Sequence, residues 1–136
     1  PNPGEGAKSL QKAVSGGELS RVLLAIKTVM AELDAVPLLI FDEVDSGISG
    51  EVGNNIGIAL RNLGKHHQVL TITHLHQVAS RADNQLAVSK QEVDGRTYTS
   101  VTNLDADGRV NELVRMLGGE SATVREHAKQ LLENCE

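Results

Sequence analysis

The sequence predicts an α/β lobe in which a small parallel sheet is flanked by helices and accompanied by a β-hairpin. Two short runs, residues 38–41 and 68–73, have the apolar and β-branched composition of strands. A segment with helical spacing of its apolar residues lies between them, so the two strands are expected to pair in parallel. Two later β-rich runs, separated by Asp94-Gly95, predict the hairpin.

The composition is typical of a small cytosolic domain. A chain of 136 residues is one domain by size, and with one Phe, one Tyr and no Trp its core is expected from Leu, Ile, Val and Ala. Few aromatic residues and a net charge of −5 give neither stacking platforms nor an overall basic surface for nucleic acid, so such contacts would need a local patch. The single Cys135 excludes an internal disulfide. No apolar stretch approaches the length of a membrane span, and no signal-peptide pattern is present.

The chain begins with residues 1–8, which predict a polar loop or linker. Apolar residues then recur at three- and four-residue steps, which predicts a helix with this buried stripe: Leu19, Val22, Leu23, Ile26, Val29, Met30 and Leu33. Ser15, Gly16 and Gly17 precede the stripe, where free N–H groups and the helix dipole favour an anion such as phosphate. The alternative is that Ser15 is simply the N-cap of the helix.

Two carboxylates, Asp42 and Glu43, follow the strand at 38–41 directly. Four consecutive apolar residues predict a strand buried on both faces, and open α/β sheets place their ligands at the carboxyl ends of such strands. An apolar strand ending in Asp-Glu is typical of a Walker B element, in which Asp42 would hold Mg²⁺ and Glu43 would orient or deprotonate water. The alternative is a buried strand that emerges into a polar turn.

The segment between the two predicted strands is expected to form the crossover that connects them. Residues 44–50 predict a loop, and a helix is expected from near Glu51 to Gly64 with this buried stripe: Val52, Ile56, Ala59, Leu60 and Leu63. Residues 65–67 (Lys-His-His) predict a solvated connector, because a metal site would need further ligands. The second strand ends at His74, and the crossover should bring its end beside that of the first strand. The residues expected near one another are Asp42, Glu43 and His74.

The rest of the chain predicts structural elements. These are a helical turn at 75–82, strands at 85–90 and 96–104, a turn at 105–108 and helices at 109–117 and 121–133. The Asp-containing turn at 105–108 is too short for a calcium loop. The last helix is expected to bury Val124, Ala128, Leu131 and Leu132.

Four segments in this order resemble the C-terminal lobe of an ABC-type ATPase head, and among such heads the RecN family of SMC-like proteins of double-strand-break repair. Residues 13–27 (AVSGGELSRVLLAIK) are similar to the signature segment, and residues 40–50 (IFDEVDSGISG) to the Walker B element and D-loop. Residues 72–80 (ITHLHQVAS) resemble the switch-histidine segment, and residues 109–119 (RVNELVRMLGG) the closing helix. The likeness covers nearly the whole chain.

The resemblance implies a role for each matched residue. Glu43 would act on the lytic water, His74 would contact the γ-phosphate as the switch, and Asp42 would serve Mg²⁺. ATP held by the partner head would meet the signature residues Ser15, Gly16, Gly17 and Glu18. The D-loop crossing the dimer interface would be formed by Asp45, Ser46 and Gly47. The implied cofactors are ATP and Mg²⁺, and the implied partners are the N-terminal head lobe of the same protein, a second protomer bound on ATP binding, and DNA.

Three departures from the family pattern qualify this reading. Ser49 stands where many ABC proteins end the D-loop in Asp, a pattern that resembles RecN more than SMC proteins, and His76 stands where Pro is expected in RecN. No Gly-rich loop ending in Gly-Lys-Ser or Gly-Lys-Thr occurs, so nothing here cradles the α- and β-phosphates. Residues 1–136 are therefore expected to be half of a composite site, inactive alone, with the Walker A lobe and coiled coil upstream. The resemblance implies a bacterial, nucleoid-associated DNA repair ATPase. The alternatives are another SMC-like DNA clamp ATPase or a non-catalytic interaction domain.

Overall fold

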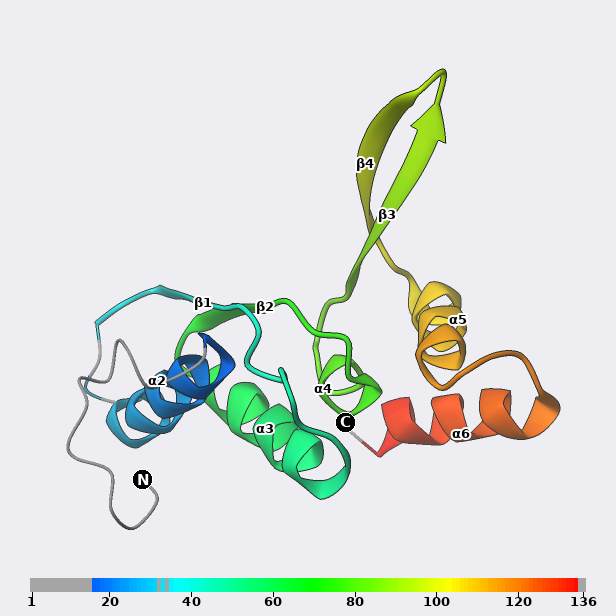
Figure 1. Ribbon diagram of the computed structural model, residues 1–136. Coiled ribbons are helices and arrows are strands. Elements are labelled where there is room, and N and C mark those ends of the chain that lie inside the picture. The colour runs from blue at the N-terminus through cyan, green and yellow to red at the C-terminus, as the bar shows by residue number, and fades with distance from the viewer. Residues whose placement is uncertain (1–15, 32, 34, 135–136) are drawn as a thin grey trace, which may run out of the picture.

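The computed structural model describes residues 16–31, 33 and 35–134. Along the chain the elements are α2 (Gly16–Met30), β1 (Leu38–Phe41), α3 (Gly50–Leu63), β2 (Gln68–Thr71), α4 (His76–Ala79), β3 (Leu86–Val93), β4 (Arg96–Asn103), α5 (Ala106–Met116) and α6 (Ala122–Glu133). One body contains α2, β1, α3 and β2, the short α4 connects it to α5 and α6, and the β3–β4 hairpin projects away from both (Figure 1). The α/β class is confirmed.

The first body is the predicted parallel crossover. β1 pairs with β2 in parallel from Leu38↔Gln68 to Phe41↔Thr71, with α3 between them in the chain. Bonds from Gln68 N to Pro37 O (2.9 Å) and from Ile72 N to Phe41 O (3.0 Å) continue the ladder at both ends. β2 itself ends at Thr71, two residues earlier than predicted.

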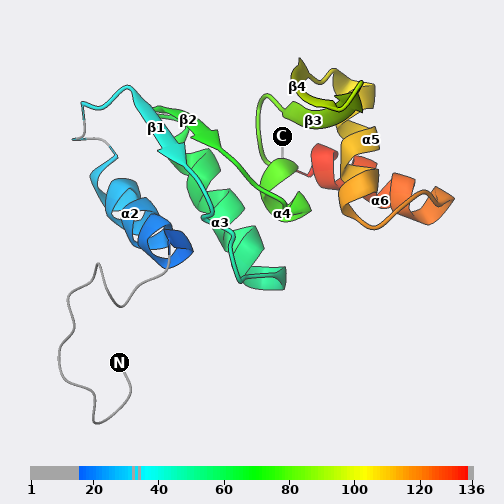
Figure 2. The ribbon, with the colours of Figure 1, turned by 45° about the horizontal axis from the view of Figure 1, so that its top comes forward.

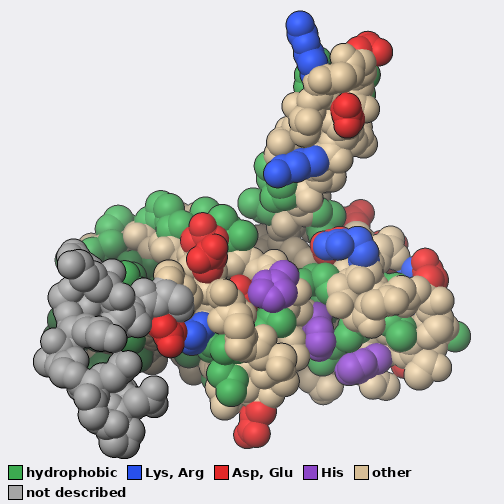
Figure 3. Space-filling view, in the orientation of Figure 1, with side chains coloured by type: hydrophobic (Ala, Val, Ile, Leu, Met, Phe, Trp, Pro, Cys, Tyr) green, Lys and Arg blue, Asp and Glu red, His purple; other side chains and the backbone are tan. Residues whose placement is uncertain are grey.

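Only one face of this sheet is covered in the described chain. Leu39 and Phe41 pack with Leu24 of α2 and with α3, and both helices lie beneath the strands in Figures 1 and 2. The alternate residues face outward, with Ile40 59% exposed, so the prediction of a strand buried on both faces is wrong. Hydrophobic side chains therefore line the face of the sheet opposite the two helices, along the top of this body in Figure 3. The exposed residues on this face are Leu38, Ile40, Leu70 and Ile72.

The apolar stripe of α2 is exposed as well. All seven residues predicted to be buried, from Leu19 to Leu33, are exposed, whereas Leu24 and Gly17 are buried. Gly17 and Leu24 face the sheet and its loops, so the stripe points away from the core that the described residues form beneath this sheet. We refer to this stripe and the uncovered sheet face together as the open apolar surface. Burying it would require a further element.

Helix α3 is buried mainly as predicted. Ile56, Leu60 and Leu63 lie in the core and Ala59 packs against it, but Val52 is 52% exposed. The reason is that α3 turns its glycines toward α4. A Cβ on Gly57 would lie 2.7 Å from Gln77 O, and one on Gly53 would lie 2.9 Å from Leu75 Cδ1. The missing side chains allow α3 and α4 to approach closely.

The connector after α3 differs from the prediction at one residue. His67 is buried, and its Nδ1 lies 2.7 Å from Val36 O. The imidazole thus links the end of the connector to the segment before β1, whereas Lys65 and His66 are exposed as expected.

A second core forms between α4, α5 and α6. Ala79, Leu113, Val114 and Ala128 are buried there, with Val124 and Leu132 packed against them. α5 begins at Ala106 rather than Arg109, because the Asp105 carboxylate accepts a bond from Gly108 N (2.8 Å) and caps the helix. The predicted turn at 105–108 is therefore wrong. Ser121 caps α6 by accepting from Val124 N (3.1 Å).

The hairpin is confirmed and is longer than predicted. β3 extends to Val93, three residues further, and pairs with β4 up to Val93↔Arg96. Asp94 (φ +52°) and Gly95 (φ +72°) form the left-handed two-residue turn that Asp-Gly favours. Within the described residues, no helix is both long and apolar enough to cross a membrane.

Candidate functional site

Three segments meet at the carboxyl edge of the β1–β2 sheet. They are the first turns of α2, the loop after β1 and the residues after β2. Ser20 Oγ donates to Asp42 O (2.8 Å), and Arg21 Nη1 donates to Val44 O (3.3 Å) and Ser46 O (2.9 Å). These bonds hold the loop after β1 against α2. The two carboxyl ends are adjacent, as predicted from the parallel crossover.

The N-terminus of α2 packs closely against this loop. A Cβ on Gly17 would lie 2.7 Å from Glu43 O and 2.9 Å from Ser46 Cβ, and one on Gly16 would lie 3.0 Å from Glu43 Oε2. The Glu43 carboxylate therefore lies beside the first turn of the helix, where the dipole favours negative charge. Glu18 is exposed in the same turn, and Ser15 lies outside the described residues.

The two glycines predict different responses to substitution. Gly17→Ala should lower the free energy of unfolding by about 1–3 kcal/mol, because the new methyl group meets a main-chain carbonyl that moves only with the whole loop. Gly16→Ala should be nearly neutral, because the Glu43 carboxylate is the far end of a flexible side chain. Urea unfolding of both variants measures the difference. Equal losses would contradict the packing described here.

Asp42 and Glu43 are both exposed on the loop. Among residues 16–31, 33 and 35–134, neither carboxylate has a hydrogen-bond or ion-pair partner. Glu43 has φ +56°, a left-handed conformation that costs free energy in a residue with a Cβ and that is concentrated at functional sites. In the described part of the chain no three His, Cys, Asp or Glu side chains form a metal-binding group. One free carboxylate nevertheless fits Mg²⁺, which keeps several waters and binds through one or two carboxylates plus phosphate.

Asp45 lies inside the fold and contacts the end of β2. It is 2% exposed, and its Oδ2 accepts from Thr73 Oγ1 (2.5 Å) and His74 N (2.9 Å). The Nδ1 atom of His74 lies 3.1 Å from the same oxygen. Burial acts to raise the pKa of Asp45, but the hydrogen bonds from Thr73 and His74 and the charge of His74 together lower it. The stability gained is present above the unfolded pKa of the carboxyl and is lost as pH falls through the lowered value.

The other D-loop residues face outward. Ser46 and Gly47 are exposed, and Gly47 has φ +70°. His74 is also at the surface, with 69% of its side chain exposed. The structure thus brings Glu43, Gly16 and Gly17 together, and joins His74 to the same loop through Asp45.

Sequence reasoning missed Ser20, Arg21 and Thr73. Ser20 and Arg21 lie three and four residues after Gly17, a spacing that puts them on the same face of α2. This spacing was the available signal that they contact the same loop as the glycine. The sequence places Thr73 at the end of a predicted strand, directly before His74, and gives no signal that its hydroxyl bonds to Asp45.

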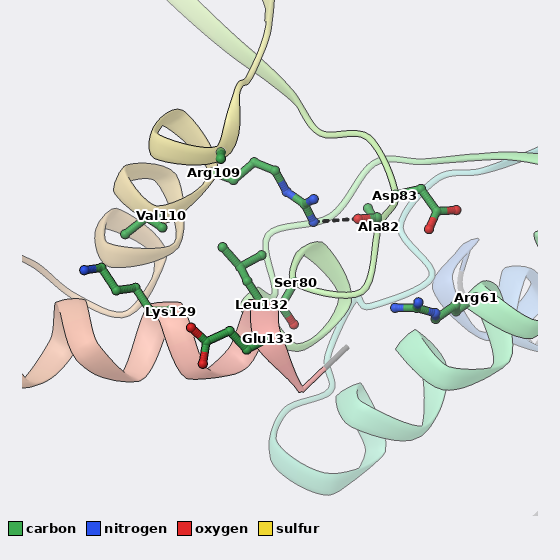
Figure 4. Close-up of a pocket in the computed structure, with 10 residues that line it drawn as sticks. Arg61, Ser80, Ala82, Asp83, Arg109, Val110, Lys129, Leu132 and Glu133 are labelled. Carbon is green, nitrogen blue, oxygen red and sulfur yellow. Dashed lines mark hydrogen bonds between the residues drawn. The ribbon is translucent and has the colours of Figure 1, made fainter. Parts of the chain in front are cut away.

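A separate cavity lies away from this sheet edge. It has a volume of about 380 Å³ and is lined by residues of α3, α5, α6 and the connection from α4 to β3 (Figure 4). Arg109 Nη2 closes part of its wall by donating to Ala82 O (2.5 Å). Its charges are of both signs, with Arg61, Arg109 and Lys129 against Asp83 and Glu133.

The relatives found by comparison with known proteins share one description. No family model matches the chain. The DNA repair protein RecN of Halalkalibacterium halodurans is 47% identical over 97% of this chain and 24% of its own length, and that of Bacillus subtilis is 46% identical over 99% and 24%. RecN of Deinococcus radiodurans is 46% identical over 96% and 23%. The chain thus spans about a quarter of the length of these relatives.

One solved structure shows the same fold. It comes from work on ATP-driven dimerization and DNA-stimulated activation of SMC ATPases. It aligns with a TM-score of 0.57 and 22% identity over 87% of this chain and 70% of that chain. At this identity the likeness concerns the fold alone.

Proposed function

Because nearly the whole chain is homologous to about one quarter of the RecN DNA repair proteins, we propose that it is the C-terminal lobe of an ABC-type, SMC-like ATPase head. The full-length protein would use ATP in recombinational repair of double-strand breaks. The observation that carries this proposal is the convergence of the α2 N-terminus, the Asp42-Glu43 pair and the His74 segment at one sheet edge. An enzyme that hydrolyses ATP needs its carboxylates and phosphate contacts on one surface.

The residues at this edge have separate proposed tasks. Asp42 would hold Mg²⁺, which when bound neutralises charge on the phosphates. Glu43 would accept the proton of the attacking water. His74 would contact the γ-phosphate. The signature residues Ser15, Gly16, Gly17 and Glu18 would face ATP held by a second protomer, and Ser46 and Gly47 would lie at that interface.

The proposed partners follow from what this lobe lacks. It has no loop for the α- and β-phosphates, so the Walker A lobe of the same protein would supply one. The open apolar surface supports a covering partner, and we assign that role to the same upstream lobe. A second protomer would complete the ATP site, and DNA would bind through the full-length protein in the bacterial nucleoid.

The isolated chain is expected neither to hydrolyse ATP nor to bind it tightly, because it offers one helix N-terminus and two carboxylates but no phosphate loop. Calorimetry with Mg-ATP on the 136-residue chain, alongside the full-length protein as positive control, makes the measurement. A low-micromolar Kd for the isolated chain would mean that the site is misplaced. A full-length protein without ATP turnover would favour a non-catalytic head instead.

A further inference from the structure

We infer that Asp45 is a positioning residue that fixes the imidazole ring of His74, rather than a residue of the dimer interface. What the fixed ring does rests on the proposed function, in which His74 contacts the γ-phosphate. The orientation of the ring is a property of this chain and rests only on the contacts described below.

A single oxygen atom organises the end of β2. Asp45 Oδ2 accepts from Thr73 Oγ1 at 2.5 Å and from His74 N at 2.9 Å, and His74 Nδ1 lies 3.1 Å from the same oxygen. Thr73 Oγ1 in turn accepts from Leu75 N (3.1 Å). The main chain on both sides of the imidazole is therefore tied, directly or through Thr73, to one carboxylate of the loop after β1.

The carboxylate is itself held firmly. Arg21 Nη1 donates to the carbonyl oxygens of Val44 and Ser46, the two neighbours of Asp45. Ile48 N donates to Asp45 O at 3.3 Å. An acceptor whose backbone is fixed on both sides keeps its direction, which is what a positioning residue requires.

The contact selects one form of the histidine ring. Asp45 has a lowered pKa, so it is ionised near neutral pH and can only accept hydrogen bonds. Nδ1 of His74 must then carry the proton, which leaves Nε2 as the ring atom directed away from Asp45. Since 69% of the side chain is exposed, Nε2 is available to a ligand on the surface.

The burial of Asp45 argues against a direct contact with another protomer. Only 2% of the residue is exposed, and its two hydrogen-bond donors and the His74 Nδ1 atom lie on the same chain. A role across the interface would require these contacts to break. Ser46 and Gly47, the next two residues, are exposed and can meet a partner without any such change.

The ring orientation can be measured without ATP. In the chain labelled with ¹⁵N-histidine, the His74 ring should show the Nδ1–H form at neutral pH. Asp45→Ala should abolish this preference, whereas Asp45→Asn, which keeps an acceptor oxygen, should retain it. Asp107→Ala, at an exposed aspartate of α5, is the matched control and should change nothing. A parent ring without the Nδ1–H preference, or one unaffected by Asp45→Ala, overturns the inference.

A double-mutant cycle in the full-length protein tests the consequence. Asp45→Ala should lower ATP turnover by about 10–100-fold, the usual effect of removing a residue that orients a ligand. In a His74→Ala background the same change should cause no further loss, and Asp45→Asn should restore part of the activity. If the losses of turnover from Asp45→Ala and His74→Ala added, Asp45 would act independently of His74. The same would follow if Asp45→Ala abolished the ATP-dependent dimer in the His74→Ala background. Normal turnover in His74→Ala alone would instead contradict the proposed function and leave the ring measurement valid.

Discussion

Glu43→Gln in the full-length protein is expected to lower ATP hydrolysis by roughly 10²–10⁴-fold, the usual contribution of a general base. Glutamine keeps the shape of the side chain but cannot accept the proton of the attacking water. Nucleotide binding should persist, since the change removes a negative charge near the γ-phosphate rather than a ligand to it. The ATP-bound, engaged dimer should therefore accumulate.

The structure indicates that this substitution changes the chemistry of residue 43 without disturbing the fold. The Glu43 carboxylate is exposed, and it has no side-chain partner in the described part of the chain, so its loss should leave the fold intact. Glu51→Gln, at another exposed glutamate near the start of α3, is the matched control and should keep the parent rate. Steady-state hydrolysis and light scattering in ATP measure the two effects. A Glu43→Gln protein with parent turnover would reduce Glu43 to a polar turn residue after a strand.

The sequence was sufficient for the elements because their signals are local. The apolar runs at β1 and β2, the helical spacing between them and the Asp94-Gly95 turn each depend on a few neighbouring residues. The parallel pairing followed from the crossover, and it placed the ends of both strands at one edge without further information. Where a cap decided the boundary, as Asp105 does for α5, the helix began earlier than its apolar pattern indicated.

Burial was harder to predict, because it depends on what covers each face. Leu19 and Ile40 have the pattern of core residues, yet both are exposed in the described chain, where α2 and α3 cover a single side of the sheet. The inward orientation of the Asp45 side chain was equally difficult to predict from the sequence. Its neighbours in sequence indicate a polar surface loop, and only the bonds from Thr73 and His74, 28 and 29 residues away, turn it inward.

Asp42→Asn is expected to weaken binding of Mg-ATP to the full-length protein by at least about tenfold, or about 1.4 kcal/mol. Asp42 is the proposed Mg²⁺ residue, and a neutral amide gives the ion less charge neutralisation than a carboxylate. The loop should keep its position, because Ser20 bonds to the main-chain oxygen of Asp42 and not to its side chain.

The test separates Asp42 from the carboxylate next to it. Calorimetry should give weaker Mg-ATP binding for Asp42→Asn and unchanged or tighter binding for Glu43→Gln. With EDTA present, the parent and Asp42→Asn should bind ATP equally, because the difference between them depends on the metal ion. If Asp42→Asn bound Mg-ATP as tightly as the parent, Mg²⁺ would have to be held by other residues, and β1 with the Asp42-Glu43 pair that follows it would lose its assignment as a Walker B element.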